Sequence, residues 1–353
     1  MHLLSLKQLP VAFSRTGASA PPWSFRDRQK MKQSTLFQSR GGELLFLSGQ
    51  DDGRAILSLG ESRKSRPPAL LPGENLSLAL SAVLSEIAEQ MWVNAALFVL
   101  FETPDSLHQV RVSLRRLGSF LLLSRILPAP PALLQKISDL ERQSRTLRSA
   151  LAPAREWEIF FQSILPGIKK RFSKPEEQDF LCLLSKRQKK QAGIKARKTL
   201  DSRGFLEIML RTKNLAEAFS KLEDSESMEL FRGRALLLLE KTVRERSSRG
   251  QSRKKAHRLR IALKTFRYVS EFFSGIESKE SPGPSFGKIR ASLDRLGRLN
   301  DLYSLRRRFV KLGKKDGSEK ERMIIGNVIR WIRRKEKKSL YRIGKLDPLS
   351  RKE

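Results

Sequence analysis

Apolar residues recur at helical spacing from Leu76 onward, and short polar or proline-rich stretches interrupt them. The first apolar stripe includes Leu80, Leu84 and Ile87, which share one side of a helix when each residue turns by about 100°. The strict alternation that is typical of strands is nearly absent. The pattern therefore predicts an all-α protein.

Breaks in this pattern give the expected helix boundaries. Pro104 and Asp105 indicate a helix start, because both residue types favour the first turn of a helix. Further breaks fall at residues 128–131, 173–175, 223–227 and 281–284. In the second half we expect helices over residues 228–249, 253–274, 286–312 and 322–341.

Residues 1–75 differ from the rest of the chain. Glycine, serine and proline cluster there, and apolar runs such as 44–47 are short. This composition is typical of a poorly ordered leader or of the remnant of a larger domain. We therefore divide the chain into this segment, a first helical bundle over 76–224, a second over 225–345, and a tail over 346–353.

One ten-residue pattern occurs twice. The segment His108-Gln-Val-Arg-Val-Ser-Leu-Arg-Arg-Leu matches His257-Arg-Leu-Arg-Ile-Ala-Leu-Lys-Thr-Phe, and two of the 3 histidines of the chain open these copies. A second short match follows each copy at a similar distance, at Arg155 and at Asn300. The simplest interpretation is an internal duplication that forms two four-helix bundles about a pseudo-twofold axis.

Each copy places bases along one edge of an apolar face. On a helical wheel, the second copy gathers its histidine and three bases within an arc of roughly 80°. These residues are His257, Arg260, Lys264 and Arg267, and the first copy repeats the arrangement with His108, Arg111 and Arg115. We expect no carboxylate on this stripe. Because like charges three and four residues apart destabilise a helix, the pattern indicates an anionic ligand.

Charge and cysteine content narrow the class of protein. The chain has 71 Lys and Arg against 37 Asp and Glu, which leaves a net charge of +34. So large an excess indicates a polyanionic partner. The single cysteine, Cys182, excludes an internal disulfide and a cysteine metal site. No apolar run reaches the ~20 residues of a membrane span. We expect a cytoplasmic protein with no span, metal or cofactor.

The duplicated pattern resembles the two signature helices of the CHAD family, the conserved histidine α-helical domains. Three further stretches are similar to elements of that family. Residues 155–158 resemble an Arg-Asp-x-Asp element that follows each signature, 300–301 its second occurrence, and 200–203 a Leu-x-Ser-x-Arg stretch. The resemblance covers residues 76–341.

This resemblance implies two four-helix bundles and a basic cleft that binds inorganic polyphosphate, a role linked to polyphosphate granules and not to catalysis. The implied binding residues are His108, Arg111, Arg115, Arg116, His257, Arg260, Lys264 and Arg267. A weaker outer set is Arg155, Arg187, Lys190, Arg197 and Arg203.

The chain departs from the family pattern at three positions. Gly118 stands where the family tends to carry another base, Glu156 replaces an aspartate, and Asn300 replaces an arginine. We therefore expect a shorter basic stripe in the first copy and stronger binding by the second copy.

Many members of this family carry an N-terminal CYTH domain, a barrel that processes triphosphates. Residues 47–57 and 62–66 faintly resemble the end of such a barrel and its linker. The metal-binding Glu-x-Glu-x-Lys of the barrel is absent from the sequence. An inactive remnant and an unrelated leader both remain open here.

Two other functions remain open. A nucleic-acid backbone is also a polyanion, although no recognised nucleic-acid-binding motif is present. A metal-dependent polyphosphatase needs clustered carboxylates, and the acids at suggestive positions are Glu156, Glu158 and Asp301. We expect these acids to orient neighbouring arginines by ion pairing. We also expect the two histidines to titrate near physiological pH, so that binding strengthens in mild acid.

Overall fold

The computed structural model describes residues 36–40, 43–47, 55–58, 62–66, 68, 73–223, 226–247, 252–274, 286–314, 317–343 and 348–349. From residue 76 the described chain is built of helices, which confirms the all-α expectation for this region. They are α2 (Leu76–Phe101), α3 (Pro104–Ser124), α4 (Pro131–Ala150), α5 (Ala152–Ile159), α6 (Leu165–Lys169), α7 (Pro175–Leu200), α8 (Arg203–Phe219), α9 (Met228–Ser247), α10 (Arg253–Phe272), α11 (Phe286–Leu312) and α12 (Glu319–Ile343), with a π-helical turn η2 (Phe160–Ile164) between α5 and α6.

Side-chain caps and first-turn prolines begin several of these helices. The side chains of Asn75, Ser202 and Ser252 each accept a hydrogen bond from a backbone N–H in the first turn, of α2, α8 and α10 respectively. Proline occupies the first turn of α3 and of α7, where a missing N–H costs nothing. Helices begin at Pro104, Pro131, Pro175 and Met228, which confirms the predicted start at 104 and the breaks at 128–131, 173–175 and 223–227.

Residues 36–58 contain three strands, so the expectation that strands are nearly absent is wrong for this segment. Strands β1 (Leu36–Arg40), β2 (Glu43–Leu47) and β3 (Ala55–Ser58) form an antiparallel sheet in the order β1-β2-β3. In the first hairpin Arg40 pairs with Glu43, so the sequence between the strands is Gly-Gly. In sequence, a Gly-Gly pair between two short apolar runs is a hairpin signal. Residues 1–35 lie outside the described residues.

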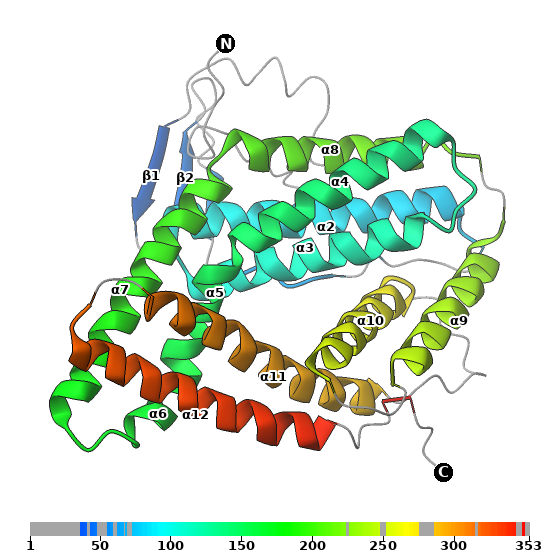
Figure 1. Ribbon diagram of the computed structural model, residues 1–353. Coiled ribbons are helices and arrows are strands. Elements are labelled where there is room, and N and C mark those ends of the chain that lie inside the picture. The colour runs from blue at the N-terminus through cyan, green and yellow to red at the C-terminus, as the bar shows by residue number, and fades with distance from the viewer. Residues whose placement is uncertain are drawn as a thin grey trace.

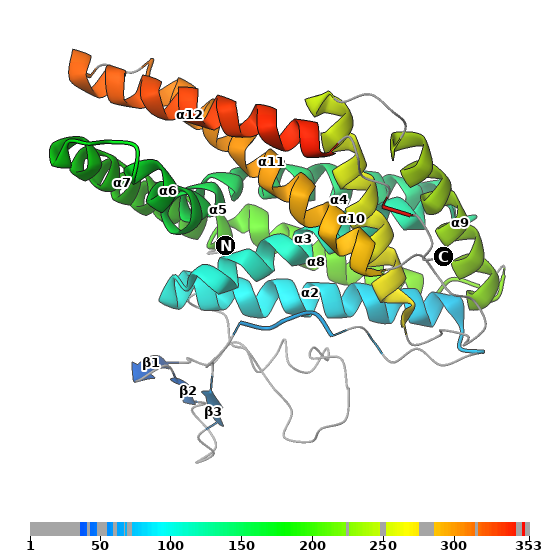
Figure 2. The ribbon, with the colours of Figure 1, turned by 90° about the horizontal axis from the view of Figure 1, so that it is seen from below.

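Four long helices of the first half form a bundle. Helix α2 packs against α3 and α8, and α4 also packs against α3 and α8. Figure 1 shows these four helices running side by side, with α5, α6 and α7 leaving the bundle at one end. In the second half, contacts join α9 to α10, α10 to α11 and α11 to α12. Figure 2 shows α12 on the side of the molecule opposite α2, with α11 running obliquely from α12 toward α2 in this view.

The largest core crosses between the two halves of the sequence. It contains buried residues from α2 to α9 and also from the later parts of α10 and α11 and the first part of α12. A smaller core joins the end of α9 to the first parts of α10 and α11. The two halves therefore share apolar packing, and the division into two four-helix bundles stays a prediction.

Phe120 of α3 lies at the centre of this shared core. Its ring is fully buried and makes edge contacts with Phe219 of α8, at 5.6 Å between centroids, and with Phe272 of α10, at 6.2 Å. One side chain thus connects the first bundle to the second signature helix. Edge-to-face pairs add to the energy of simple burial.

Replacing Phe120 by alanine is expected to lower the free energy of unfolding by about 3–5 kcal/mol, because a fully buried ring leaves a cavity. Since the ring joins both halves, we expect one shifted transition for the helical region. Urea unfolding followed by circular dichroism measures this change. A variant that unfolds in two steps, with one step unshifted, would contradict the shared core.

Helix α2 is the one described helix that is long and apolar enough to match a membrane span. More than half of its most apolar segment is buried within the protein. It lies against α3 and α8, and residues 62–66 also lie along it, where Arg63 forms ion pairs with Glu86 and Glu89 at 2.6 and 2.5 Å. These contacts are those of a central core helix.

Candidate anion-binding site

The two copies of the repeated pattern lie on α3 and α10, and these helices contact each other. Their apolar faces enter the core as the helical wheel predicts, with no member more than 6% exposed. These residues are Val110, Leu114, Leu117, Phe120 and Leu121 on α3, and Leu259, Ala262, Leu263, Phe266 and Val269 on α10. Burial of both faces fixes the rotation of each helix and thus the side on which its bases lie.

The charge of Arg115 acts on bases of both copies. Burial, followed by the nearby charge of Arg115, lowers the pKa of Arg260 to about 10 and that of Lys264 to about 6. On its own helix, burial and then the charge of Arg115 lower the pKa of Arg111 to about 9. Bases from the two copies therefore occupy one electrostatic environment.

Arg148 of α4 belongs to the same group, although the sequence analysis missed it. Its backbone oxygen accepts a hydrogen bond from Arg111 Nη1 at 3.0 Å. Its own Nη1 atom lies 3.5 Å from the place that a Cβ at Gly118 would take. Burial and then the charge of Arg115 lower the pKa of Arg148. The guanidinium of Arg148 thus lies next to Gly118, the position at which the first copy lacks a base. This weakens the reason to expect a shorter basic stripe in the first copy.

We call these side chains the basic cluster. Its members are His108, Arg111 and Arg115 of α3, Arg148 of α4, and His257, Arg260 and Lys264 of α10. Most members are half-buried, Arg111 is buried with 8% of its surface exposed, and His257 is exposed. Partly desolvated cations that repel one another are costly in the free protein and favourable next to an anion.

The histidines occupy the margin of the cluster. Burial and the charges of Arg155 and Arg115 lower the pKa of His108 to about 4, so the expectation that it titrates near physiological pH is wrong. Burial also lowers the pKa of His257. The Nδ1–H of His257 donates to Asn300 Oδ1 at 3.2 Å. Each histidine therefore lies beside the short motif that follows its copy, Arg155 in one case and Asn300 in the other.

Most carboxylates next to the basic cluster form ion pairs with arginines outside the cluster. Glu158 pairs with Arg155 at 2.7 Å, and Glu156 pairs with Arg308 of α11. These two pairs confirm the expectation that the acids of this region orient arginines. Asp301 lies near Arg260 and Lys264, whose pKa values it raises, against the larger effect of burial. The pair between Glu156 and Arg308 also connects α5 to α11 beside the cluster.

Arg116 does not join the basic cluster. It is completely buried on a different face of α3, where its Nη1 donates to Gln90 Oε1 at 3.1 Å. Its guanidinium carbon lies 5.4 Å from the ring centroid of Phe272. The prediction that Arg116 is a binding residue is not supported by this position. Arg116 directly follows Arg115 on the helix and therefore faces about 100° away from it. Arg116 is a core residue in this structure.

Arg267 lies beside Lys264 but has a carboxylate partner. Its Nε atom lies 3.2 Å from Glu271 Oε1, and its guanidinium carbon lies 4.9 Å from the ring centroid of Tyr268. The expectation that no carboxylate stands on the stripe is therefore wrong, because Glu271 follows Arg267 by one helical turn. Arg267 is a half-neutralised member at the edge of the site.

The outer set divides into two groups. Arg155 is half-buried and lies next to His108. Arg187 and Lys190 are exposed on α7, Arg197 pairs with Glu102 at 3.0 Å, and Arg203 pairs with Glu207 at 3.0 Å. Among the described residues, no hydrogen bond or ion pair connects the last four to the basic cluster.

Replacing Arg148 by glutamine is expected to weaken the binding of a multiply charged anion by roughly tenfold, the effect of one lost charge-assisted contact. Glutamine keeps the helix and most of the side-chain length. The measurement is calorimetric titration with tripolyphosphate. Arg142→Gln, on the same helix with a 76% exposed side chain, serves as the control. Equal affinities of the two variants would remove Arg148 from the site.

The described residues hold no group of three or more His, Cys, Asp and Glu side chains arranged to bind a metal ion.

Comparisons with known proteins identify one family. The family model described as CHAD domain matches residues 82–310. The crystal structure of the CHAD domain from the plant Ricinus communis is similar with a TM-score of 0.68 and 26% identity, over 80% of this chain and 95% of that chain. PptA from Streptomyces chartreusis is similar in fold, with a TM-score of 0.58 and 12% identity, over 76% of this chain and 98% of that chain. No curated protein sequence matches.

Proposed function

The chain belongs to the CHAD family, and we propose that it binds inorganic polyphosphate at the basic cluster. The observation that carries this proposal is the contact between α3 and α10, which brings the two signature helices together, with the charge of Arg115 acting on bases of both. A flexible polymer with regular charges requires several cations in one place rather than a shaped pocket. The cluster offers guanidinium groups from three helices.

Arginine suits this ligand because its planar group donates two parallel hydrogen bonds to phosphate oxygens. Lys264 adds a point charge once it is protonated. Each neutralised phosphate also releases condensed counterions, by analogy with nucleic acids. Binding is therefore expected to weaken steeply as salt concentration rises.

The test is a binding titration of the full chain with polyphosphates of defined length at several salt concentrations. We expect saturable binding whose logarithm falls linearly with the logarithm of salt concentration. Competition with tRNA and with duplex DNA at fixed salt distinguishes the main alternative. If either nucleic acid displaces polyphosphate at lower concentration, the protein is a nucleic-acid-binding protein instead.

We propose a binding role without catalysis. Glu156 and Glu158 are engaged by Arg308 and Arg155, which supports a structural role for these acids. Incubation of long-chain polyphosphate with the protein and Mg²⁺ or Mn²⁺ tests this point. Release of phosphate above a heat-inactivated control would make the protein a polyphosphatase.

We further propose a cytoplasmic location at polyphosphate granules. A fluorescent fusion that overlaps with stained granules would support it, and an even distribution in granule-containing cells would contradict it.

The finer architecture is also a proposal. The matched positions of His108 beside Arg155 and of His257 beside Asn300 support two bundles, 76–224 and 225–345, about a pseudo-twofold axis. The three antiparallel strands within residues 36–58 support the origin of 1–75 as a CYTH remnant.

A further inference from the structure

The middle of helix α12 faces α6 across a hollow, which we call the α6/α12 hollow. Figure 1 shows the two helices side by side, at the end of the molecule where α6 and α7 leave the four-helix bundle. The hollow has a volume of ≈ 540 Å³, which is within the usual range of ligand pockets. Ile168 and Phe172, which are buried, and the half-buried ring of Trp331 form its apolar wall. The hollow therefore has room for a planar apolar group and an aromatic ring to contact it.

Two features of α6 position the ring of Trp331. A Cβ at Gly167 would lie 3.9 Å from Trp331 Cζ2, so the indole lies close to the backbone of α6. The π-helical turn η2 leads directly into α6, and such turns are frequent at functional sites. The indole is thus held against the wall of the hollow instead of extending freely into solvent.

Five cations surround this apolar wall. Arg330, Arg334, Lys335 and Lys338 lie on one face of α12, and Arg171 follows α6. All five are exposed, and within the described part of the chain none of them forms an ion pair with a carboxylate. An unbalanced group of this kind favours a ligand with several negative charges, such as a chain of phosphates.

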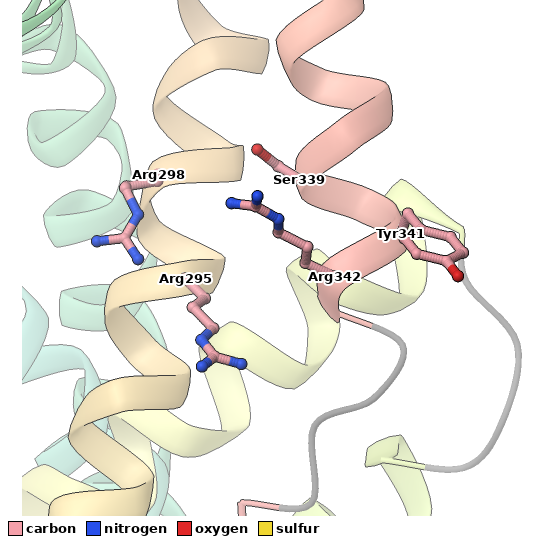
Figure 3. A pocket seen from close by; sticks show the side chains of 5 residues that line it. All are labelled: Arg295, Arg298, Ser339, Tyr341 and Arg342. Carbon is pink, nitrogen blue, oxygen red and sulfur yellow. The ribbon is translucent and has the colours of Figure 1, made fainter.

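A hollow between α11 and the end of α12 provides a contrast. It is lined by Arg295, Arg298, Ser339, Tyr341 and Arg342. Figure 3 shows the ring of Tyr341 extending away from the three guanidinium groups, and 68% of this residue is exposed. Cations gather in both hollows, but of the two only the α6/α12 hollow combines them with an apolar aromatic wall. Charge alone therefore does not explain its lining.

We propose that the α6/α12 hollow binds a nucleoside triphosphate, with the nucleobase stacked on Trp331 and the phosphates on the surrounding cations. Lys335 Nζ lies 5.3 Å from the centroid of the Trp331 ring. Because an aromatic face attracts both cations and nucleobases, the nucleobase takes the place of this ammonium group, which turns toward the phosphates on its flexible side chain. Arg330, Arg334 and Arg171 donate to phosphate oxygens. Polyphosphate has no ring to stack, so this site goes beyond the proposed function and does not depend on it.

The test compares ATP with tripolyphosphate, which carries the same number of phosphates without a nucleoside. Calorimetric titrations use the full chain with Arg115→Met/Arg260→Met, so that binding at the basic cluster is weakened. Into this background we introduce Trp331→Leu, which removes the ring, and Trp331→Phe, which keeps one. The control is Tyr341→Leu, which removes an exposed ring from the same helix. Circular dichroism shows whether each variant is folded.

In the cluster-weakened background we expect ATP to bind more tightly than tripolyphosphate. Trp331→Leu should lower the affinity for ATP by about 5- to 150-fold, the range for one stacked nucleobase, and leave that for tripolyphosphate unchanged. Trp331→Phe and Tyr341→Leu should retain most of the affinity for ATP. Equal affinities for ATP and tripolyphosphate, or an equal loss of ATP binding in Trp331→Leu and Tyr341→Leu, would overturn the inference.

A second variant keeps the inference testable if Trp331→Leu does not fold. Arg334→Gln/Lys338→Gln changes two exposed cations of the hollow and leaves its apolar wall intact. We expect it to weaken ATP binding by roughly tenfold or more, the effect of lost charge-assisted contacts. Unchanged ATP binding in this variant would overturn the inference. Displacement of ATP by single-stranded RNA at a lower concentration would make RNA the ligand of the hollow instead.

Discussion

Replacement of Arg115 by methionine is expected to weaken polyphosphate binding by roughly ten- to a hundredfold, the range for a charge-assisted hydrogen bond in a partly buried site. Arg115 is the residue whose charge affects both signature helices, through Arg111 on α3 and through Arg260 and Lys264 on α10. Its loss removes a ligand contact and also separates the two copies electrostatically. Calorimetric titration at fixed pH and salt measures the change.

The neighbouring residue provides a matched control. Arg116→Met makes the same chemical change one position away, but Arg116 is fully buried against Gln90 and Phe272. We expect the affinity of this variant to remain within about twofold of wild type, since replacement of a buried charge by an apolar group is often tolerated. Thermal unfolding shows whether the variant is folded. If Arg116→Met lost as much affinity as Arg115→Met, the assignment of Arg115 to the basic cluster and of Arg116 to the core would be wrong.

The affinity for polyphosphate is expected to depend strongly on pH, and this dependence comes from Lys264 rather than from the histidines. Burial and the charges of Arg115, Arg260 and Arg267 lower the pKa of Lys264 to about 6, so the free protein carries a neutral amine at pH 8. A bound polyanion favours the charged amine and raises this pKa. Binding at pH 8 is therefore coupled to proton uptake. We expect affinity to rise by up to roughly tenfold per pH unit between pH 8 and 6, and to level off below pH 6.

Stability should follow pH in the opposite direction. In the unfolded chain Lys264 keeps its proton up to a pKa of 10.5, whereas in the folded protein it keeps it only below about 6. Between these values unfolding takes up a proton, so this residue favours the folded state more as pH rises and less as it falls. Lys264→Met removes the penalty. We expect this variant to be more stable than wild type by about 1–4 kcal/mol near pH 6.

Two variants test this assignment. Lys264→Met should bind polyphosphate more weakly at pH 6, with an affinity that changes little between pH 6 and 8. His108→Ala should keep most of the pH dependence, because the pKa of His108 is lowered to about 4. A pH dependence that is retained in Lys264→Met and lost in His108→Ala would transfer the effect to the histidine.

The helical framework was predictable from sequence because its signals are local. Apolar spacing and proline-containing breaks indicated the starts of α3, α7, α10 and α11 at the residues where the structure has them. The inward faces of α3 and α10 were also predictable, since they depend on helical periodicity alone. The strands were missed because each has only four or five residues. Such short runs show little alternation.

The site was only partly predictable because it depends on contacts between helices. The wheel grouped His257, Arg260 and Lys264 correctly, but a single helix cannot show that Arg115 of the other copy lies beside them. Arg148 lies on α4, outside any motif. The missing base at Gly118, next to which Arg148 lies, was the one sequence feature that pointed to it. Glu271 was detectable on the wheel as a partner of Arg267 and was overlooked. The expectation that the second copy dominates binding stays a prediction.

The central claim is that the two copies form one site. Calorimetric titration of the full chain with tripolyphosphate at low salt tests it most directly. We expect one tight site per chain, whose affinity falls in both Arg115→Met and Arg260→Met, which alter different copies. Two equal sites per chain, each weakened by only one of these variants, would contradict it.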